Sequence, residues 1–210
     1  MGKRATFKTP MLIAAGAAGL LALTILPGPT HAAPTNCGNI VQGFYDALLS
    51  TMKNGRTLGQ SGRFAQLQPV IWRSFDIATM ARLSVGPSWA TLTETQRQRV
   101  TESLGRYIAA IYAERFDSYA GQKLQVTGDQ PASAGVMVRS QIIKADGESV
   151  NIDYMMRRSG QDWMISDIYL DGAISEVATR RSEFSALLKN EGVDGLIAAL
   201  NRKADALISR

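Results

Sequence analysis

The chain has 210 residues, of which 45% are hydrophobic, 20% charged and 7% aromatic. This composition is typical of a folded protein and excludes a disordered or low-complexity chain. The formal net charge is +5, but three basic and no acidic residues lie within residues 1–32, so the rest carries 20 basic and 18 acidic residues. No basic run interleaved with aromatic residues is present, which argues against a nucleic-acid partner.

The N-terminus has the pattern of a signal peptide. A positively charged start is followed by the uncharged, apolar stretch Met11–Leu26, then by a Pro-Gly-Pro break and small residues up to Ala32. The apolar stretch is shorter than the roughly 20 residues that a membrane span needs. We therefore expect cleavage after Ala32, export to the periplasm, and a single folded domain over residues 33–210.

Two residue counts limit the chemistry of the exported chain. The one histidine is His31, which leaves with the signal peptide, and Cys37 is the one cysteine. Imidazole acid–base catalysis and metal sites built from His or Cys are therefore not expected. An internal disulfide needs a second cysteine. We expect no metal, no cofactor and no catalytic residues.

Helical patterns occupy the first half of this domain. Apolar residues recur at helical spacing, and capping residues mark several helix ends. The patterns predict a helix over residues 39–53, a second from Ser61 through Ile71, a third from the N-cap Asp76 to Gly86, and a fourth from the capping-box pair Thr93 and Gln96 to about Tyr119.

The apolar period then becomes twofold, which is typical of strands. It predicts strands over Lys123–Thr127, Gly135–Lys144, Val150–Arg158 and Trp163–Leu170. Turn signals between them favour an antiparallel meander. Two helices follow, one over Ser175–Lys189 and one starting at Asp194. The predicted fold is α+β, with about four antiparallel strands covered by several helices.

Short motifs in this order resemble a known family. They are Phe75-Asp76-x-x-x-Met80-Ala81-Arg82, Gly86-x-x-Trp89, Asn151-Ile152-Asp153-Tyr154, Trp163-Met164-Ile165-Ser166-Asp167-Ile168, Asp171-Gly172-x-Ile174-Ser175 and Gly192-x-x-x-Leu196-Ile197. Together they resemble the MlaC family of periplasmic lipid carriers, also called toluene-tolerance auxiliary proteins. The segments Val85-Gly86-Pro87-Ser88-Trp89 and Phe116-Asp117-Ser118-Tyr119-Ala120-Gly121 are most similar to its hopanoid-associated HpnM branch.

The resemblance implies an NTF2-like fold, in which a curved sheet and its helices enclose a deep apolar cavity for lipid tails. It implies that phospholipid or hopanoid is carried as cargo between an inner-membrane MCE–ABC transporter complex and an outer-membrane lipoprotein–porin complex. Such a carrier makes and breaks no bond, so it needs no titrating group. It does need an apolar interior, since exposing hydrocarbon to water costs roughly 0.8 kcal/mol per CH₂.

Candidate site residues follow from the apolar stripes and the resemblance. The expected cavity wall is Phe75, Met80, Leu83, Trp89, Ile108, Ile111, Tyr112, Val138, Ile142, Ile152, Tyr154 and Ile168. For each of these, plain core packing is the alternative. The expected head-group or partner contacts are Arg82, Arg180 and Arg181, for which a solvated surface arginine is the alternative. Asp153 is expected to pair with Arg157 across strands, or Asp167 with an arginine.

Two other functions remain open. An NTF2-like enzyme of the isomerase type would use Tyr154 with Asp153 or Asp167. Because adjacent strand residues face opposite sides, Tyr154 and Asp153 do not easily share one pocket. The second alternative is a cavity-free periplasmic adaptor of an ABC transporter. A cavity able to take an acyl chain separates a carrier from an adaptor.

Overall fold

The computed structural model describes residues 36–210, which belong to one compact unit. The expected signal peptide and its cleavage site lie outside the described residues. The first half contains the helices α1 (Cys37–Lys53), α2 (Gly55–Ser74), α3 (Ile77–Val85) and α4 (Glu94–Arg115), with the 3₁₀ helix η1 (Gly86–Thr91) before α4. None of the helices formed by residues 36–210 combines the length and apolar character that a bilayer crossing requires.

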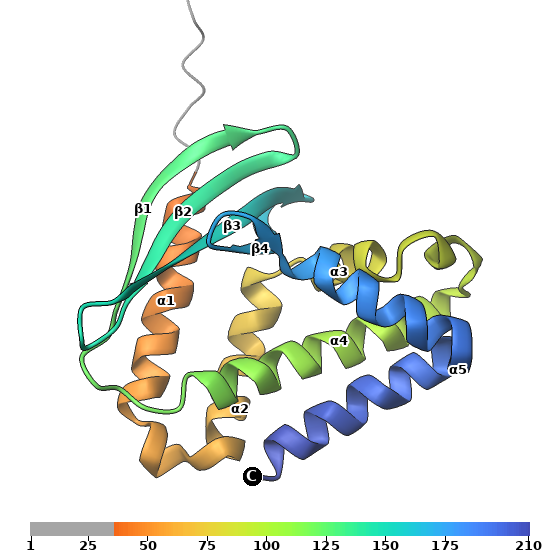
Figure 1. Ribbon diagram of the computed structural model, residues 1–210, viewed down its shortest axis with the longest axis horizontal. Helices are drawn as coiled ribbons and strands as arrows, with labels where there is room; N and C mark the ends of the chain where they lie inside the picture. Colours follow the sequence, from red (N-terminus) through yellow and green to blue (C-terminus); the bar gives the residue numbers. More distant parts are fainter. Residues whose placement is uncertain (1–35) are drawn as a thin grey trace, which may run out of the picture. The chain divides into compact units, whose positions relative to one another are not determined.

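The second half forms an antiparallel sheet in the order β1-β2-β3-β4-β5, followed by one long helix (Figure 1). The strands are β1 (Lys123–Ala132), β2 (Gly135–Ile143), β3 (Ser149–Ser159), β4 (Asp162–Leu170) and β5 (Ile174–Ser175), and the helix is α5 (Glu176–Ile208). The predicted α+β fold with a curved antiparallel sheet is confirmed.

The sheet differs from its prediction in two places. β1 continues five residues past Thr127, through a Gly-Asp-Gln-Pro segment that by composition is typical of a turn. A register shift between Val126 and Gly128 lets this segment pair with the start of β2. β5 was not predicted, because two residues are too short to show a period, and only their pairing with Tyr169 and Leu170 of β4 defines the strand.

Glycines divide two of the helices. Gly59 breaks α2 with φ 60° and ψ −177°, so its second half corresponds to the helix predicted from Ser61, and residues 55–58 form an additional turn that was not predicted. Gly192 breaks α5 in the same way, with φ 68° and ψ −172°. The two predicted C-terminal helices are therefore the two halves of α5. Helix α4 ends at Arg115, four residues before its predicted end, because Phe116 leaves helical geometry with ψ 57°.

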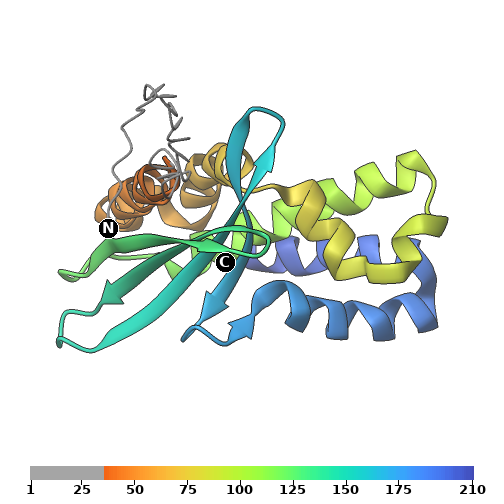
Figure 2. The same cartoon turned by 90° about the horizontal axis from the view of Figure 1, so that it is seen from above.

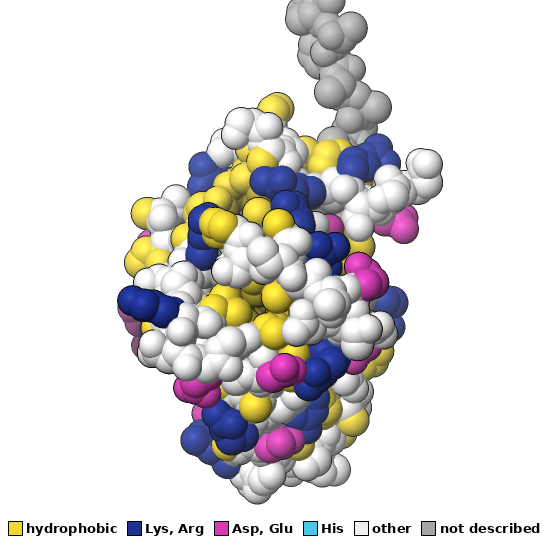
Figure 3. All heavy atoms as spheres, turned by 90° about the vertical axis from the view of Figure 1, so that its right-hand side faces the viewer, with side chains coloured by type: hydrophobic (Ala, Val, Ile, Leu, Met, Phe, Trp, Pro, Cys, Tyr) yellow, Lys and Arg dark blue, Asp and Glu magenta, His cyan; other side chains and the backbone are white. Residues whose placement is uncertain are grey.

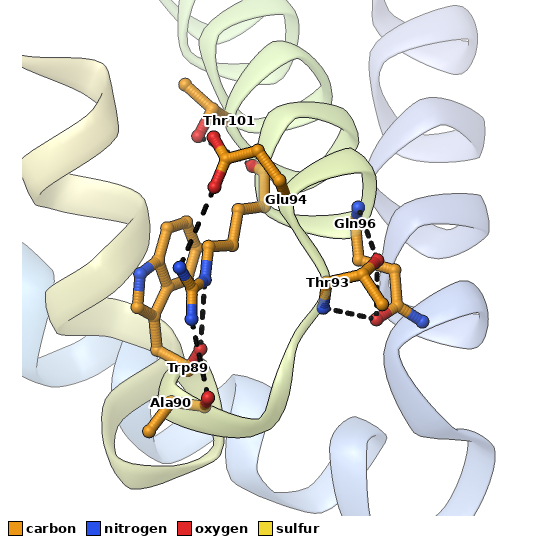
Figure 4. A network of polar contacts seen from close by, with 7 residues as sticks. Trp89, Ala90, Thr93, Glu94, Gln96 and Thr101 are labelled. Atoms are coloured by element: carbon orange, nitrogen blue, oxygen red, sulfur yellow. Dashed lines mark hydrogen bonds and ion pairs between the residues drawn. The ribbon is translucent and has the colours of Figure 1, made fainter.

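The predicted helix caps at Asp76 and Thr93 are confirmed. The Asp76 carboxylate accepts from the backbone N–H of Thr79 at 3.0 Å. At the start of α4, Gln96 N–H donates to Thr93 Oγ1 at 3.2 Å, and Thr93 N–H donates to Gln96 Oε1 at 3.0 Å (Figure 4). These reciprocal bonds satisfy backbone donors that the first turn of a helix leaves free.

The helices form two groups around the sheet. α1 packs along β1 and β2, whereas α4 passes under the sheet and continues beside α3 and both halves of α5 (Figures 1 and 2). The main core lies where these groups meet the concave face of the sheet. An aromatic cluster marks this point: Phe44 of α1 is 5.2 Å from Phe75, 5.3 Å from Tyr112 and 6.3 Å from Tyr154, measured between ring centroids.

Candidate functional site

A cavity of about 200 Å³ lies between the concave face of the sheet and helix α4. Strands β3 and β4 form one wall, α4 forms the opposite wall, and α3 and the first turn of α5 close it. Its lining consists of Met80, Ile108, Ile111, Tyr112, Arg115, Phe116, Ile152, Tyr154, Ile168, Leu170, Glu176 and Arg180. The walls are apolar except for the two phenol hydroxyls, for Arg115 of α4, and for the ion pair of Glu176 and Arg180 in α5, which is called the charged end below.

Seven of the twelve predicted wall residues line this cavity, namely Met80, Ile108, Ile111, Tyr112, Ile152, Tyr154 and Ile168. The sheet residues come together through register, since Tyr154 of β3 lies opposite Ile168 of β4. The helix residues follow the helical period, because Ile108, Ile111 and Tyr112 are three and four positions apart on α4. Their contact with a lipid stays a prediction.

The other five predicted wall residues lie outside the lining. Phe75 and Val138 are fully packed in the core. Val138 and Ile142 belong to β2, which contacts α1, and Ile142 is partly buried and packs against the core. Leu83 is half-buried at the edge of the core. These positions share one cause, because an apolar period marks the inward face of an element without showing whether that face meets a side chain or a void.

Trp89 is held in a polar network at the junction of η1 and α4. The Arg97 guanidinium lies 5.9 Å from the centroid of the Trp89 ring. It also donates to the backbone oxygens of Trp89 and Ala90, each at 3.3 Å (Figure 4). Glu94 completes the network with an ion pair to Arg97 at 3.7 Å. This tryptophan therefore fixes the η1–α4 turn and does not line the cavity.

The three candidate arginines have different surroundings. Arg180 lines the cavity, and its side chain is 12% exposed. Arg82 is exposed on α3, and Arg181 is exposed on α5 with its guanidinium against Gly86. Of the three, the structure thus places only Arg180 at the cavity.

Arg180 is held by two neighbours and keeps one free donor. Its Nη2 lies 3.4 Å from Glu176 Oε2, and its guanidinium is 5.4 Å from the centroid of the Tyr107 ring. Its Nε is buried without a hydrogen-bond partner among the described residues. A buried donor without a partner is costly, and an oxygen that reached Arg180 Nε would remove this cost.

Four lining residues were not predicted: Arg115, Phe116, Leu170 and Glu176. Phe116 belongs to the apolar stripe of the fourth predicted helix, so a signal for it exists. Leu170 is the last residue of β4, and at the end of a strand the alternation of apolar and polar residues gives little evidence of which face a side chain joins. Arg115 and Glu176 are charged, and a pattern of apolar residues does not predict that charged residues line a cavity.

The acidic residues of the enzyme alternative point elsewhere. Asp153 is 3% exposed and forms an ion pair with Arg139, not with Arg157 as predicted. Asp167 accepts from Ser175 Oγ at 2.6 Å and from the backbone N–H of Val177 at 3.1 Å, so it fixes the start of α5 instead of pairing with an arginine. Neither carboxylate lines the cavity.

The cavity tyrosines are held in their neutral form. Burial raises the pKa of Tyr154 well above its ordinary value and also raises the pKa of Tyr112. Tyr45, behind the wall, also has a raised pKa because of burial. Among residues 36–210, no group of His, Cys, Asp and Glu side chains is placed to hold a metal ion.

A second hollow, separate from the cavity, lies on the right-hand side of Figure 1. This is the side of η1 and of the turn between the halves of α5. Hydrophobic side chains gather in it, and Lys and Arg side chains border it on several sides (Figure 3). Asp and Glu side chains also lie along this border, so the face combines an apolar centre with a rim of mixed charge (Figure 3).

Comparison with known proteins identifies the family. The profile of the MlaC protein family matches residues 42–202, so the chain belongs to the MlaC family. The structure also resembles that of a phospholipid-binding protein from Ralstonia solanacearum, solved in complex with a phospholipid. That match has a TM-score of 0.71 and 23% sequence identity, and it covers 82% of this chain and 99% of the other. It shows that the two proteins share a fold.

Proposed function

We propose that this protein is a periplasmic lipid carrier. It shelters an acyl or hopanoid chain in the cavity between the sheet and α4, and it moves lipid between inner-membrane and outer-membrane complexes. The observation that carries this proposal is an apolar cavity with a charged end, formed by Glu176 and Arg180. Membership of the MlaC family and the fold shared with a phospholipid complex support it.

The physical basis is the cost of moving a lipid tail through water. Each exposed CH₂ costs roughly 0.8 kcal/mol, so an unprotected acyl chain crosses an aqueous compartment very slowly. Isoleucines on α4, β3 and β4 surround the lipid tail with hydrocarbon, as the bilayer interior does. Met80 adds a flexible apolar side chain to this wall. Such walls attract hydrocarbon without selecting a chain strongly.

The cavity must widen to receive its cargo. Its volume of about 200 Å³ is below the roughly 300–1,000 Å³ that is typical of ligand sites. The walls belong to separate elements, so a small separation of α4 and the first half of α5 from β3 and β4 enlarges the space. At the charged end, Arg180 meets the phosphate of an anionic head group while the tails lie between the isoleucines.

The same geometry weighs against the two alternatives. An isomerase of the type considered needs a carboxylate beside a tyrosine in the cavity, whereas Asp153 and Asp167 are bonded elsewhere. An adaptor with a solid core would lack the cavity. We propose further that the docking partners are an MCE–ABC transporter complex and a lipoprotein–porin complex, and that the protein catalyses no reaction.

Lipid extraction tests the carrier function. The full chain is expressed with export to the periplasm, purified, extracted with organic solvent and analysed by mass spectrometry. We expect bound phospholipid or hopanoid. Ile111→Trp fills the cavity and is expected to remove most of the bound lipid, whereas Ile174→Trp, at a side chain 57% exposed on β5, is the matched control.

Thermal unfolding shows whether both variants remain folded. The proposal fails if the wild-type protein carries no amphiphile and takes none up from phospholipid vesicles. It also fails if Ile111→Trp and Ile174→Trp retain equal amounts of lipid.

A further inference from the structure

The ion pair of Glu176 and Arg180 is shielded from water on both sides. In every other ion pair within residues 36–210, at least one of the two side chains is 44% exposed or more. In this pair the exposed fractions are 23% for Glu176 and 12% for Arg180. Both residues also line the cavity. An ion pair held away from water contributes little to stability, so stability does not account for its place in the cavity wall.

The two side chains are joined loosely, which leaves hydrogen-bonding capacity on both. One contact connects them, from Arg180 Nη2 to Glu176 Oε2 at 3.4 Å. The pair therefore lacks the two parallel bonds of a bidentate contact between arginine and a carboxylate. Arg180 Nε is buried without a partner, and the Glu176 carboxylate accepts no other hydrogen bond from residues 36–210. The pair keeps an unused donor and unused acceptor sites beside the cavity.

The third charged residue of the lining, Arg115, lies apart from this pair. The Arg180 guanidinium is 5.4 Å from the centroid of the Tyr107 ring on α4. Arg115 comes eight positions after Tyr107 on the same helix, which is about 12 Å along the helix axis, and it is exposed. Water and salt screen an exposed charge over such a distance. Close to Arg180, the cavity wall thus presents one positive and one negative group side by side.

Such a pair treats anionic and zwitterionic head groups differently. A phosphate bound to Arg180 lies beside the Glu176 carboxylate, which has the same sign of charge. If the head group carries no positive group, the repulsion from Glu176 opposes the attraction to Arg180. If an ammonium group follows the phosphate, it donates to Glu176 while the phosphate accepts from Arg180. Every charge at this end of the cavity then has a partner of opposite sign.

We propose that Glu176 is a specificity-determining residue for the head group. It favours zwitterionic cargo, in which an ammonium group follows the phosphate, over anionic cargo. This preference rests on the carrier function proposed above, and it adds a chemical class to the head group. Local helix energetics account for Glu176 only in part. An acid in the first turn and a pair four positions apart stabilise a helix on any surface, and neither requires a place in the cavity wall.

A competition between two lipids tests this preference. The delipidated full chain is incubated with vesicles that hold equal amounts of phosphatidylethanolamine and phosphatidylglycerol with identical acyl chains. The protein is then separated from the vesicles and extracted, and mass spectrometry measures the ratio of the bound lipids. We expect the wild-type protein to hold about three- to tenfold more phosphatidylethanolamine, which corresponds to one net hydrogen bond. The ratio within one sample does not depend on the fraction of protein that is active.

Two variants locate the effect. Glu176→Gln removes the charge and keeps the size of the side chain, so we expect the ratio to fall to about one or below as more phosphatidylglycerol binds. Glu183→Gln removes the same charge from an exposed side chain two turns further along α5, and it is the control that keeps the wild-type ratio. Thermal unfolding shows whether both variants are folded, and the ratio for the wild-type protein tests the preference without them.

The outcomes separate the two proposals. If the wild-type protein takes up both lipids in the proportion of the vesicles, the role of Glu176 is wrong and the carrier function stands. A preference that survives Glu176→Gln, or that Glu183→Gln removes equally, also overturns this role. So does a folded Glu176→Gln variant that binds neither lipid, because Glu176 would then be needed for binding itself. If the wild-type protein takes up neither lipid, both proposals fall.

Discussion

Arg180 and Arg181 are neighbours in the sequence with the same charge, but the fold places them differently. Arg180 turns toward the cavity, beside Glu176 and over the ring of Tyr107. Arg181 lies exposed against Gly86. Because successive helix residues are rotated by about 100°, only one of two neighbours reaches a given surface. The pair thus offers a matched test of the charged end of the cavity.

We expect Arg180→Gln to lower lipid uptake from phosphatidylglycerol vesicles several-fold, since the charge beside the head group is lost. Uptake from phosphatidylcholine vesicles should change less. Arg181→Gln removes the same charge one residue away and should behave like the wild-type protein. Co-sedimentation with labelled lipid measures both. Equal effects of the two variants would show that only net charge matters and would contradict a specific role for Arg180.

At the scale of the elements, short local signals set where helices begin and break. The capping box at Thr93 and the N-cap at Asp76 were predicted from a few residues, because their bonds join positions three apart. The lengths of β1 and β5 were not predicted, because pairing with a distant strand decides them. Local bonds are visible in a short window of sequence, and long-range pairing is not.

Removing the capping box should weaken α4. We expect Thr93→Ala to lower the free energy of unfolding by about 1 kcal/mol, as the loss of an N-cap side chain usually does. Thr95→Ala, on an exposed residue in the first turn of the same helix, is the control and should change it little. Urea denaturation followed by circular dichroism measures both. A loss as large for Thr95→Ala would mean that the cap is not the cause.

Two glycine-to-alanine changes should have opposite signs. Gly192 has φ 68°, which side chains rarely adopt, so Gly192→Ala is expected to cost about 1–3 kcal/mol of stability. Gly43 lies inside α1 with open space around its missing Cβ, so Gly43→Ala should stabilise by about 0.5–1 kcal/mol. Chemical denaturation gives both values. Stabilisation by Gly192→Ala would show that α5 is continuous there.

At the scale of the whole molecule, the tyrosines at and behind the cavity wall come from parts that are far apart in the sequence, and their rings pack around Phe44. Tyr45 comes from α1, Tyr112 from α4 and Tyr154 from β3. The cavity thus exists only once both helix groups have packed on the sheet.

The burial of three tyrosines makes stability depend on alkaline pH. Burial raises the pKa of Tyr45, Tyr112 and Tyr154 in the folded state above the ordinary value of 10.0. Below pH 10 the tyrosines are protonated in both the folded and the unfolded chain, and their contribution to the free energy of unfolding is complete. Above pH 10 the unfolded chain releases these protons first, so this contribution is lost as the pH rises. We expect the free energy of unfolding to fall above pH 10. Tyr154→Phe should show a shallower fall, and an unchanged slope would contradict this assignment.

The sequence alone determined the class of fold, the order of its elements, several caps and the family, because these depend on local period, local bonds and motif order. Only the tertiary structure decided that Val138 packs under α1 while Ile152 faces a void, that Asp153 pairs with Arg139, and that three tyrosines meet. A period identifies which side of an element turns inward. What that side meets depends on how distant elements pack against it. This packing decides whether the interior is a solid core or contains a cavity.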